Sequence, residues 1–481
     1  MAIIHGANTL SSGYDIDNSC RFDDGSSTYL KDSTGNAAPA GNRQKFTYSV
    51  WFKRCKIGVT QMFAAASYSS GDEGYLYISG GDVMVWHHSS SGMGHMVTTQ
   101  VFRDTAAWYH LVWAVDTTQG TAANRMKFYI NGTQVTSFST ETYPDEDKEI
   151  YWNVGGTYYP YIGRRHGGDY FDGYMAEVVH IDNAQLAASS FGEFDSSSPT
   201  IWKPIDPSDL TFGTAGYWLD FEDSSDLGKD VSGVGNHFVS TNLAAIDQTT
   251  DTPTNNFCVL NSLDNEAAMV FAEGNLETLS TTSNKSWVMG TFALTAGKWY
   301  WEAKLTGTGG THSGDNWNHI GISNVSPVGA TDDLGGDAGQ VTIFQHDGKK
   351  YVNAATEATY AAAWATNDII GVALDCDNNK IYFSKGGAWA TGSGAWDSTT
   401  FDSGVGDIDI TAPASTTNGH YFPVWGDGGV NVNKTWQFNF GNPVHSISSG
   451  NTDGNDYGNF EYAVPSGYYS ICSKNLGAYG G

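Results

Sequence analysis

The chain has 481 residues, of which 14% are aromatic and 16% are charged, and 58 are glycines. This composition excludes a disordered chain and is typical of a turn-rich, globular β protein with two or three domains. The formal net charge of −28, from 24 basic and 52 acidic residues, argues against nucleic acid and anionic membranes as partners, because both bind clustered lysine and arginine. No apolar run approaches the length needed for insertion into a membrane.

Residues 1–17 form a short polar leader without the basic start and long apolar core of a signal peptide. We therefore expect the protein to be made in a cytoplasm. The leader is interpreted either as a frayed terminus or as a docking peptide.

Five cysteines are spread over the chain: Cys20, Cys55, Cys258, Cys376 and Cys472. Their wide spacing and odd number predict buried free thiols rather than a metal knuckle or a redox motif.

Residues 18–195 are predicted to form a first β-sandwich. Segments 46–54, 108–116 and 127–132 are rich in aromatic and β-branched residues and alternate in polarity, which is a strand signal. Asn131-Gly132 is typical of a hairpin turn. His110 lies within the second of these strands, and we expect it to be a satisfied core or rim residue rather than a base.

Residues 196–262 are predicted to be a connector with strand segments, because proline-containing stretches mark extended chain at both of its ends. Segment 216–222 alternates like a strand and is followed by a polar turn at 230–236. We expect this segment to pack on one of the sandwiches.

Residues 263–443 are predicted to form a second β-sandwich, with strands near 298–304, 369–375, 380–384 and 436–441. The C-terminal tail, residues 444–481, is rich in glycine and serine and is a candidate contact for a partner. The sequence thus predicts an all-β protein of two antiparallel β-sandwiches in tandem.

The first half resembles a concanavalin A-like lectin/glucanase domain of the laminin-G-like type. Four motifs carry the resemblance in order: Trp108-Tyr109-His110-Leu111-Val112, Phe128-Tyr129-Ile130-Asn131-Gly132, Tyr161-Ile162-Gly163 and Phe171-Asp172-Gly173-Tyr174-Met175-Ala176-Glu177-Val178. The resemblance implies a concanavalin A-like jelly roll. The chain departs from the family at Ala176, where an acidic residue often precedes Glu177, so no metal or ligand role is carried over to that turn.

The second half resembles a SPRY domain. The motifs, again in order, are Tyr300-Trp301-Glu302, Ile320-Gly321-Ile322, the strand at 368–375, Ile381-Tyr382-Phe383, Tyr421-Phe422-Pro423-Val424 and Asn439-Phe440-Gly441. SPRY domains are non-enzymatic binding sandwiches, so this resemblance implies recognition through loops and no catalytic residue.

The tandem arrangement and its Thr-Asp-Thr-Pro-Thr-Asn-Asn connector also resemble tail-fibre and other virion-surface proteins of marine bacteriophages, including phages of cyanobacteria. This resemblance implies a virion-surface localisation after assembly in the host cytoplasm. The cellular role is inferred only by analogy with proteins that have the same arrangement of domains.

A glycan hydrolase needs paired carboxylates on one strand face, and Asp220 and Glu222 are the nearest match. Trp218 stands where the nucleophile would be and Asp223 falls on the opposite face, so we expect a strand with solvent-facing acids and no enzyme.

No cofactor is expected, and calcium is the alternative. Asp375, Asp377 and Asn379 offer oxygen atoms at alternate positions, as calcium loops do. The glycine and distal glutamate of such a loop are missing, and a β-turn is the favoured interpretation.

One stretch concentrates loop aromatics next to basic residues, the combination that stacks on sugar rings and bonds their hydroxyls. The candidate ligand-binding residues are Trp152, Tyr158, Tyr159, Arg164, Arg165, His166 and Tyr170. A subunit interface requires the same residue types and remains the alternative for this stretch.

The leading hypothesis is a non-enzymatic bacteriophage virion-surface protein, a tail fibre, spike or head decoration, that binds glycans or another receptor on the host surface. Its expected partners are those glycans, other virion proteins and further copies of itself in a homo-oligomer. The alternative is a purely structural decoration or adaptor protein, and a glycan hydrolase ranks third.

Overall fold

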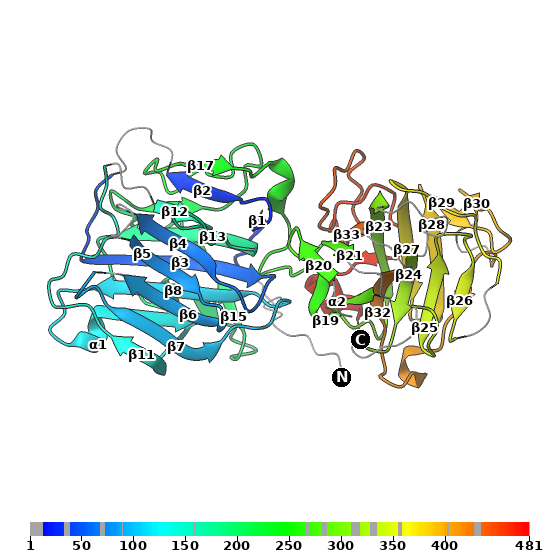
Figure 1. The fold of residues 1–481 in the computed structure, drawn as a ribbon, viewed down its shortest axis with the longest axis horizontal. Helices are drawn as coiled ribbons and strands as arrows, with labels where there is room; N and C mark the ends of the chain where they lie inside the picture. Colours follow the sequence, from blue (N-terminus) through cyan, green and yellow to red (C-terminus); the bar gives the residue numbers. More distant parts are fainter. Residues whose placement is uncertain are drawn as a thin grey trace. The chain divides into compact units, whose positions relative to one another are not determined.

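The computed structural model describes residues 13–32, 39–67, 73–88, 90–156, 160–265, 269–280, 286–308, 318–327, 334–354, 358–399, 401, 404–427 and 434–480. They fall into two compact units, Gly6–Asn256 and Phe257–Gly481, and each unit is built almost wholly of strands and loops (Figure 1). The predicted fold class, two antiparallel β-sandwiches in tandem, is confirmed.

The first domain contains two sheets, called sheet A and sheet B here. Sheet A has the order β10 (Thr133–Gln134), β9 (Met126–Ile130), β8 (Tyr109–Asp116), β3 (Lys45–Arg54), β13 (Gly173–Asp182), β1 (Ser19–Phe22) and β18 (Gln248–Thr249), with β16 (Tyr217–Leu219) also paired to β13. Sheet B has the order β11 (Phe138–Thr142), β7 (His95–Val101), β6 (Val83–His88), β5 (Glu73–Ile78), β4 (Gln61–Ser67), β12 (Pro160–Ile162), β2 (Tyr29–Asp32) and β17 (Phe238–Thr241).

The inner faces of sheets A and B enclose an aromatic core. Trp86 of sheet B stacks on Trp113 of sheet A with ring centroids 4.4 Å apart. Because strand residues alternate between faces, the half-buried Tyr75 and Tyr77 of β5 point away from this core, and Leu76 and Ile78 point into it.

The outer face of sheet A is covered by a later stretch of the same chain. This stretch includes η1 (Ala188–Ser190) and the two-stranded ribbon of β14 (Gly192–Phe194) and β15 (Trp202–Pro204). Within the second hydrophobic cluster that results, His110 stacks on Trp51 at 4.4 Å and accepts a hydrogen bond from Trp202 Nε1 through Nδ1 at 2.9 Å. Its Nε2 then donates to Ser49 Oγ at 2.8 Å, so His110 is a satisfied core histidine, as its strand pattern predicted.

The boundary between the domains differs from the predicted connector at 196–262. Residues as far as Asn256 belong to the first domain, because β16, β17 and β18 complete its two sheets by pairing with β13, β2 and β1. Part of the predicted leader belongs to it as well, since the backbone N–H and C=O of Ile16 both bond to Thr254 Oγ1. The remaining short helices of this domain are α1 (Ala122–Arg125) and η2 (Ala245–Asp247).

The second domain also contains two sheets, called sheet C and sheet D. Sheet C has the order β19 (Leu260–Asn265), β22 (Ser286–Gly290), β32 (Phe422–Asp427), β24 (Asn318–Ser323), β25 (Gln340–Phe344) and β26 (Lys350–Val352). Sheet D has the order β20 (Met269–Ala272), β21 (Glu277–Ser280), β33 (Lys434–Asn439), β23 (Lys298–Thr308), β27 (Ile369–Asp375), β28 (Lys380–Lys385), β29 (Ala388–Ala390) and β30 (Trp396–Asp397), with β31 (Ile408–Asp409) paired to β28 and β34 (Tyr469–Ser470) to β23. Four fully buried tryptophans, Trp299, Trp301, Trp425 and Trp436, fill the core of this domain, and η3 (Pro413–Ser415) is a short turn outside its sheets.

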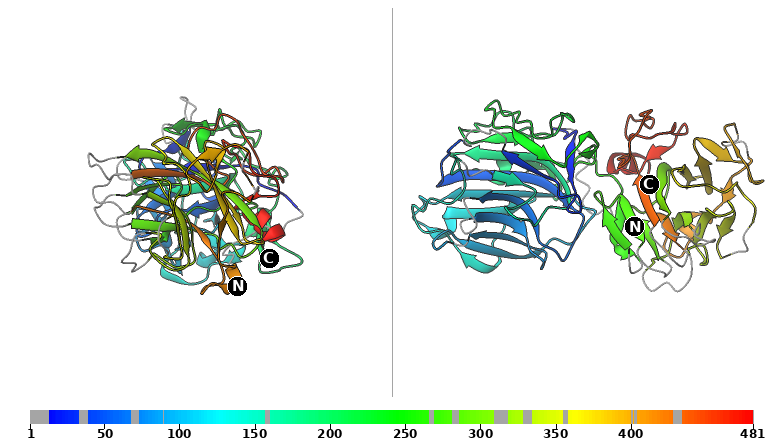
Figure 2. Two further views of the ribbon diagram at one scale, coloured as in Figure 1. Left: turned by 90° about the vertical axis from the view of Figure 1, so that its right-hand side faces the viewer. Right: turned by 45° about the horizontal axis from the view of Figure 1, so that its top comes forward.

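The C-terminal tail packs on its own domain. Glu302 of β23 is fully buried and accepts hydrogen bonds from the backbone N–H groups of Glu461 and Tyr462 at 3.0 and 2.8 Å. Strand β34 then pairs in parallel with β23, and the tail ends in α2 (Ser473–Tyr479), the red helix of Figure 2. The described residues of the tail complete the second domain, and contact between the tail and a partner stays a prediction.

All five cysteines are buried and form no disulfide, as predicted. None of the described helices has the length and apolar character needed to cross a membrane.

Candidate functional site

The outer face of sheet B carries a row of rings that runs across several strands. The cross-strand register places Tyr161 of β12 opposite Ala65 of β4, Ala65 opposite Tyr75 of β5, and Tyr75 opposite His87 of β6. Directly paired residues lie on the same face of a sheet. Since Ala64 and Ala66 belong to the core cluster, Ala65 and its partners face outward.

The row continues onto β7, where His95 pairs with His87 and the two imidazoles lie 4.8 Å apart. Burial, and then the proximity of His95, lower the pKa of His87. This end of the face therefore presents a neutral imidazole at neutral pH.

Arg164 is held over this face by a tight turn after β12. Gly163 has φ +82°, and a Cβ added there would lie 2.9 Å from the ring of Phe22, so the position requires glycine. The N–H of Gly163 bonds to the carbonyl of Phe63 at 2.9 Å, and its own carbonyl accepts from Phe171 N–H at 2.8 Å. The backbone that presents Arg164 is therefore anchored on both sides.

Three tyrosine rings surround the Arg164 guanidinium. Its central carbon lies 4.3 Å from the ring centroid of Tyr29, 5.1 Å from that of Tyr161 and 5.5 Å from that of Tyr170. The attraction between a cation and the ring faces contributes about 0.5–1 kcal/mol at exposed sites and more when the cation is desolvated. We call Arg164, Tyr29, Tyr161 and Tyr170 the arginine–tyrosine cluster.

Arg165, the next residue, contacts a second group. It forms an ion pair with Asp169 and lies 5.6 Å from the ring centroid of Tyr75. The Tyr75 hydroxyl donates to Glu73, and burial followed by this hydrogen bond raises the pKa of Tyr75 to about 12. Tyr75 is therefore a neutral hydrogen-bonding ring at physiological pH.

The structure brings four of the predicted ligand-binding residues together: Arg164, Arg165, His166 and Tyr170. His166 is 58% exposed, with Nδ1 3.8 Å from a carboxylate oxygen of Glu73. Tyr158 and Tyr159 lie outside the described residues.

The structure differs from the prediction at Trp152. Its indole is 2% exposed and packs in the core against Phe46 and Trp113, with ring centroids 6.1 and 5.0 Å away. A ligand at the surface cannot reach this ring. Sequence reasoning also missed Tyr29, Tyr75 and His87; the signal that could have found the last two is the alternation of residues within β5 and β6.

The predicted carboxylate pair does not lie on a strand. Strand β16 ends at Leu219, Asp220 accepts a hydrogen bond from the N–H of Glu222 at 3.1 Å, and Phe221 between them has φ +61°. The alternation that would place both acids on one strand face therefore does not apply.

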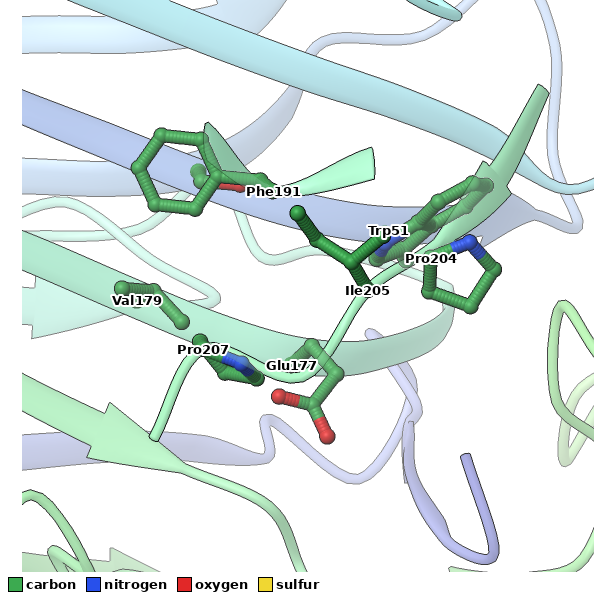
Figure 3. Close-up of a pocket in the computed structure, with 8 residues that line it drawn as sticks. Trp51, Glu177, Val179, Phe191, Pro204, Ile205 and Pro207 are labelled. Atoms are coloured by element: carbon green, nitrogen blue, oxygen red, sulfur yellow. The ribbon is translucent and has the colours of Figure 1, made fainter. Parts of the chain in front are cut away.

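A third carboxylate, Glu177, lies in a small hollow between β13 and the segment that covers sheet A. Figure 3 shows Glu177 and Val179 on the strand with Pro204, Ile205 and Pro207 crossing over them. Glu177 has φ +47° at a β-bulge and accepts hydrogen bonds from the Tyr14 hydroxyl and the indole N–H of Trp218. Burial raises its pKa to about 8, although these two bonds oppose the rise. The hollow has room for about one water molecule, so it cannot admit a sugar.

One acidic cluster has the geometry of a metal site. Oxygen atoms of Asp23, Asp24 and Asp172 lie within 4.8 Å of one another. The Lys56 ammonium, however, forms ion pairs with Asp24 and Asp172, the latter at 3.1 Å, and so supplies the positive charge that a cation would bring. This cluster does not support a calcium site.

The other calcium candidate forms the favoured β-turn. Asp375 accepts hydrogen bonds from Asp377 N–H, from Asn378 N–H and from the Asn378 side chain, at 3.1, 2.8 and 2.8 Å, between β27 and β28. It also forms a 2.8 Å ion pair with Lys298. The carboxylate of Asp375 is thus already engaged by protein donors.

Comparison with known proteins finds one matching family model within each domain. Residues 24–188 match the concanavalin A-like lectin/glucanases superfamily, and residues 298–405 match the SPRY domain. The chain therefore carries a concanavalin A-like domain followed by a SPRY domain. No curated protein matches it.

Several solved structures are similar to this chain at low identity. The SPRY domain of human HERC1 is 13% identical, with a TM-score of 0.28, and the match covers 37% of this chain and 96% of that one. A putative carbohydrate-binding protein from Bacteroides ovatus is 17% identical, with a TM-score of 0.30, and the match covers 47% of this chain and 60% of that one. A heptameric pentraxin from Limulus polyphemus is 14% identical, with a TM-score of 0.26, and the match covers 36% of this chain and 80% of that one.

Proposed function

We propose that this chain, a concanavalin A-like domain followed by a SPRY domain, is a non-enzymatic carbohydrate-binding protein whose ligand site is the outer face of sheet B. The observation that carries the proposal is the arginine–tyrosine cluster beside the Tyr161–Tyr75–His87 row. Flat rings stack on the C–H faces of sugars, and neighbouring N–H and O–H donors bind the hydroxyls. Membership of the first domain in a lectin-containing superfamily supports the same function.

We further propose that the protein is displayed on a bacteriophage virion as a tail fibre, spike or head decoration and binds glycans on the host surface. The support is the resemblance of the tandem arrangement and connector to proteins of marine phages. Single sugar sites bind weakly, and a homo-oligomer would raise the effective ligand concentration without any new contact. Other virion proteins would then hold this oligomer on the particle.

A structural decoration or adaptor protein is the second candidate, and one observation favours it. Val239 of the edge strand β17 is 52% exposed, and it joins the same row of the face through Lys31, which pairs with both Val239 and Tyr161. An exposed valine in one row with lysine and tyrosine suits a protein–protein interface as well as a sugar site.

The test is retention on a panel of immobilised bacterial and algal polysaccharides, with and without calcium, while released reducing ends are measured in parallel. Retention without release supports the carbohydrate-binding function. Release of reducing ends would show a hydrolase instead. Absence of both, from the assembled protein, would favour the decoration or adaptor role.

A further inference from the structure

We infer that the glycan bound by sheet B is acidic, and that Arg164 recognises its carboxylate or sulfate group. This inference rests on the proposed carbohydrate-binding function and names the class of ligand for that same site. The supporting observation is the set of charged groups around Arg164.

Arg164 differs from every other arginine of the chain. The sequence has seven arginines, and six of them form an ion pair with a carboxylate: Arg21 with Asp247, Arg43 with Glu149, Arg54 and Arg103 with Asp82, Arg125 with Glu146, and Arg165 with Asp169. Within the part of the chain that the structure describes, Arg164 has no such partner. Its one hydrogen bond runs from Nε to the carbonyl of Arg165 at 2.8 Å.

An arginine without a carboxylate partner among the described residues is unexpected in a chain with 52 acidic and 24 basic residues. The turn and the three tyrosine rings fix the guanidinium, while its terminal N–H groups make no bond to any described residue. A guanidinium presents paired N–H donors in a plane that matches the two oxygens of a carboxylate or sulfate. A fixed guanidinium loses less conformational entropy when it binds such a group.

Neighbouring groups of the face fit an acidic sugar. Lys31 pairs with Tyr161 on the same face, and the exposed His166 follows Arg165. The nearby acids are already engaged, because Asp169 pairs with Arg165 and Glu73 accepts from Tyr75. The half-buried rings of Tyr29 and Tyr170 would contact the ring carbons of the sugar, the buried Tyr161 would support Arg164 from below, and Arg164 would bind the acidic substituent.

The net charge of −28 opposes the binding of an acidic glycan, because the protein as a whole repels polyanions. Binding of an acidic glycan therefore requires a local cationic group that outweighs this repulsion. It also follows that added salt has two effects, since it screens both the general repulsion and the contact with Arg164. For this reason the test compares ligands and variants at one ionic strength.

The experiment measures binding of the full-length protein to immobilised polygalacturonate, to the same polymer with its carboxyl groups methyl-esterified, and to polyglutamate. We expect polygalacturonate to bind at least about ten-fold more tightly than either control polymer, because the ester cannot form the charge-assisted hydrogen bond with Arg164 and polyglutamate has no sugar ring to stack on the tyrosines. Arg164→Gln should remove most of this preference. Arg164→Lys should retain part of it, because the charge remains and the paired donors are lost.

The matched control is Arg103→Gln, which removes one positive charge from a 59% exposed arginine elsewhere in the same domain and should leave binding unchanged. Equal binding of the acid and the ester, or no effect of Arg164→Gln on a protein that still binds glycans, would overturn the inference and leave the proposed function standing. Equal binding of polyglutamate would also overturn it, since charge alone would then explain the result. No binding to any polysaccharide of the panel would overturn the proposed function and the inference together.

Discussion

The ammonium of Lys53 and the carboxylate of Asp251, 198 positions apart in the sequence, form a 2.9 Å ion pair in which both side chains are completely buried. Lys53 lies on β3 in the middle of sheet A, and Asp251 lies just before the boundary with the second domain. Asn256 accepts a further bond from Lys53 at 2.8 Å, and Trp108 donates its indole N–H to Asp251 at 3.0 Å. This network fixes the end of the first domain onto its central strand.

Asp251→Asn should strongly destabilise the first domain. The substitution leaves the Lys53 ammonium buried without its carboxylate, and loss of one partner of a buried ion pair costs roughly 3–5 kcal/mol. The free energy of unfolding, measured from urea titrations followed by tryptophan fluorescence, reports the effect. A Lys53→Met/Asp251→Leu double variant is the control, because it removes both charges and should lose less stability than the single variant. A single variant within about 0.5 kcal/mol of wild type would contradict this account.

Removal of residues 444–481 should destabilise or unfold the second domain. The tail contributes Phe460, Tyr468 and Ile471 to its hydrophobic clusters and supplies the two N–H groups that bond to Glu302. Without the tail, the Glu302 carboxylate keeps the donors Tyr300 and Asn439 but loses its two backbone donors, and each hydrogen bond to a charged group is worth about 1.5–3 kcal/mol.

Soluble expression and thermal unfolding of the truncated chain test this prediction. Glu302→Gln is the milder companion variant, since it keeps the tail and weakens only the hydrogen bonds of this one side chain, those with the tail and those with Tyr300 and Asn439. A truncated chain with an unchanged melting transition of its second domain would show that the tail is dispensable for folding.

Strand patterns predicted much of the fold. The alternation around Trp51 and Trp113 marks β3 and β8, which are central strands of sheet A, and the motifs around Trp301 mark β23 in sheet D. The extent of each domain could not be predicted in the same way. Strands β17 and β18 are only four and two residues long, too short for a periodic pattern, and they are defined by their pairing with β2 and β1.

The candidate site was only partly predictable for a similar reason. Local composition identified Arg164 and Tyr170, which are six residues apart, but Tyr29 comes from a strand 135 positions away from Arg164. The same criterion wrongly selected Trp152, because its neighbours in the sequence are loop residues although its indole packs in the core. Contacts between distant strands are fixed by register, which the sequence does not show directly.

Acid should destabilise the first domain partly through His110. Burial lowers the pKa of this imidazole from 6.5 to about 3 in the folded protein. Between these values the unfolded chain binds a proton that the folded chain does not, so the stability contributed by neutral His110 is complete above pH 6.5 and is lost as the pH falls. Each pH unit within the window costs up to about 1.4 kcal/mol.

His110→Gln isolates this effect from the other titrating groups, because glutamine can accept from Trp202 and donate to Ser49 but does not titrate. The variant should be less stable than wild type at pH 7, and the difference between the two should narrow as the pH falls toward 4. Urea unfolding at a series of pH values measures it. A difference that stays constant over this range would show that His110 does not titrate as the structure requires.

Tyr29→Ala should weaken glycan binding while leaving the fold intact. Tyr29 is half-buried on the outer face of sheet B, and its ring is the one nearest to the Arg164 guanidinium, at 4.3 Å. Removing the ring takes away one stacking surface and releases the guanidinium from its fixed position, for an expected loss of about 1 kcal/mol, or about five-fold in Kd. Tyr29→Phe is the matched control, because it keeps the ring face and should bind like wild type.

The measurement is retention of each variant on the polysaccharide that binds wild type most tightly. Unfolding curves measured in parallel separate a local loss of binding from a loss of folding. If Tyr29→Ala and Tyr29→Phe bind equally well, the arginine–tyrosine cluster is not the sugar-binding surface.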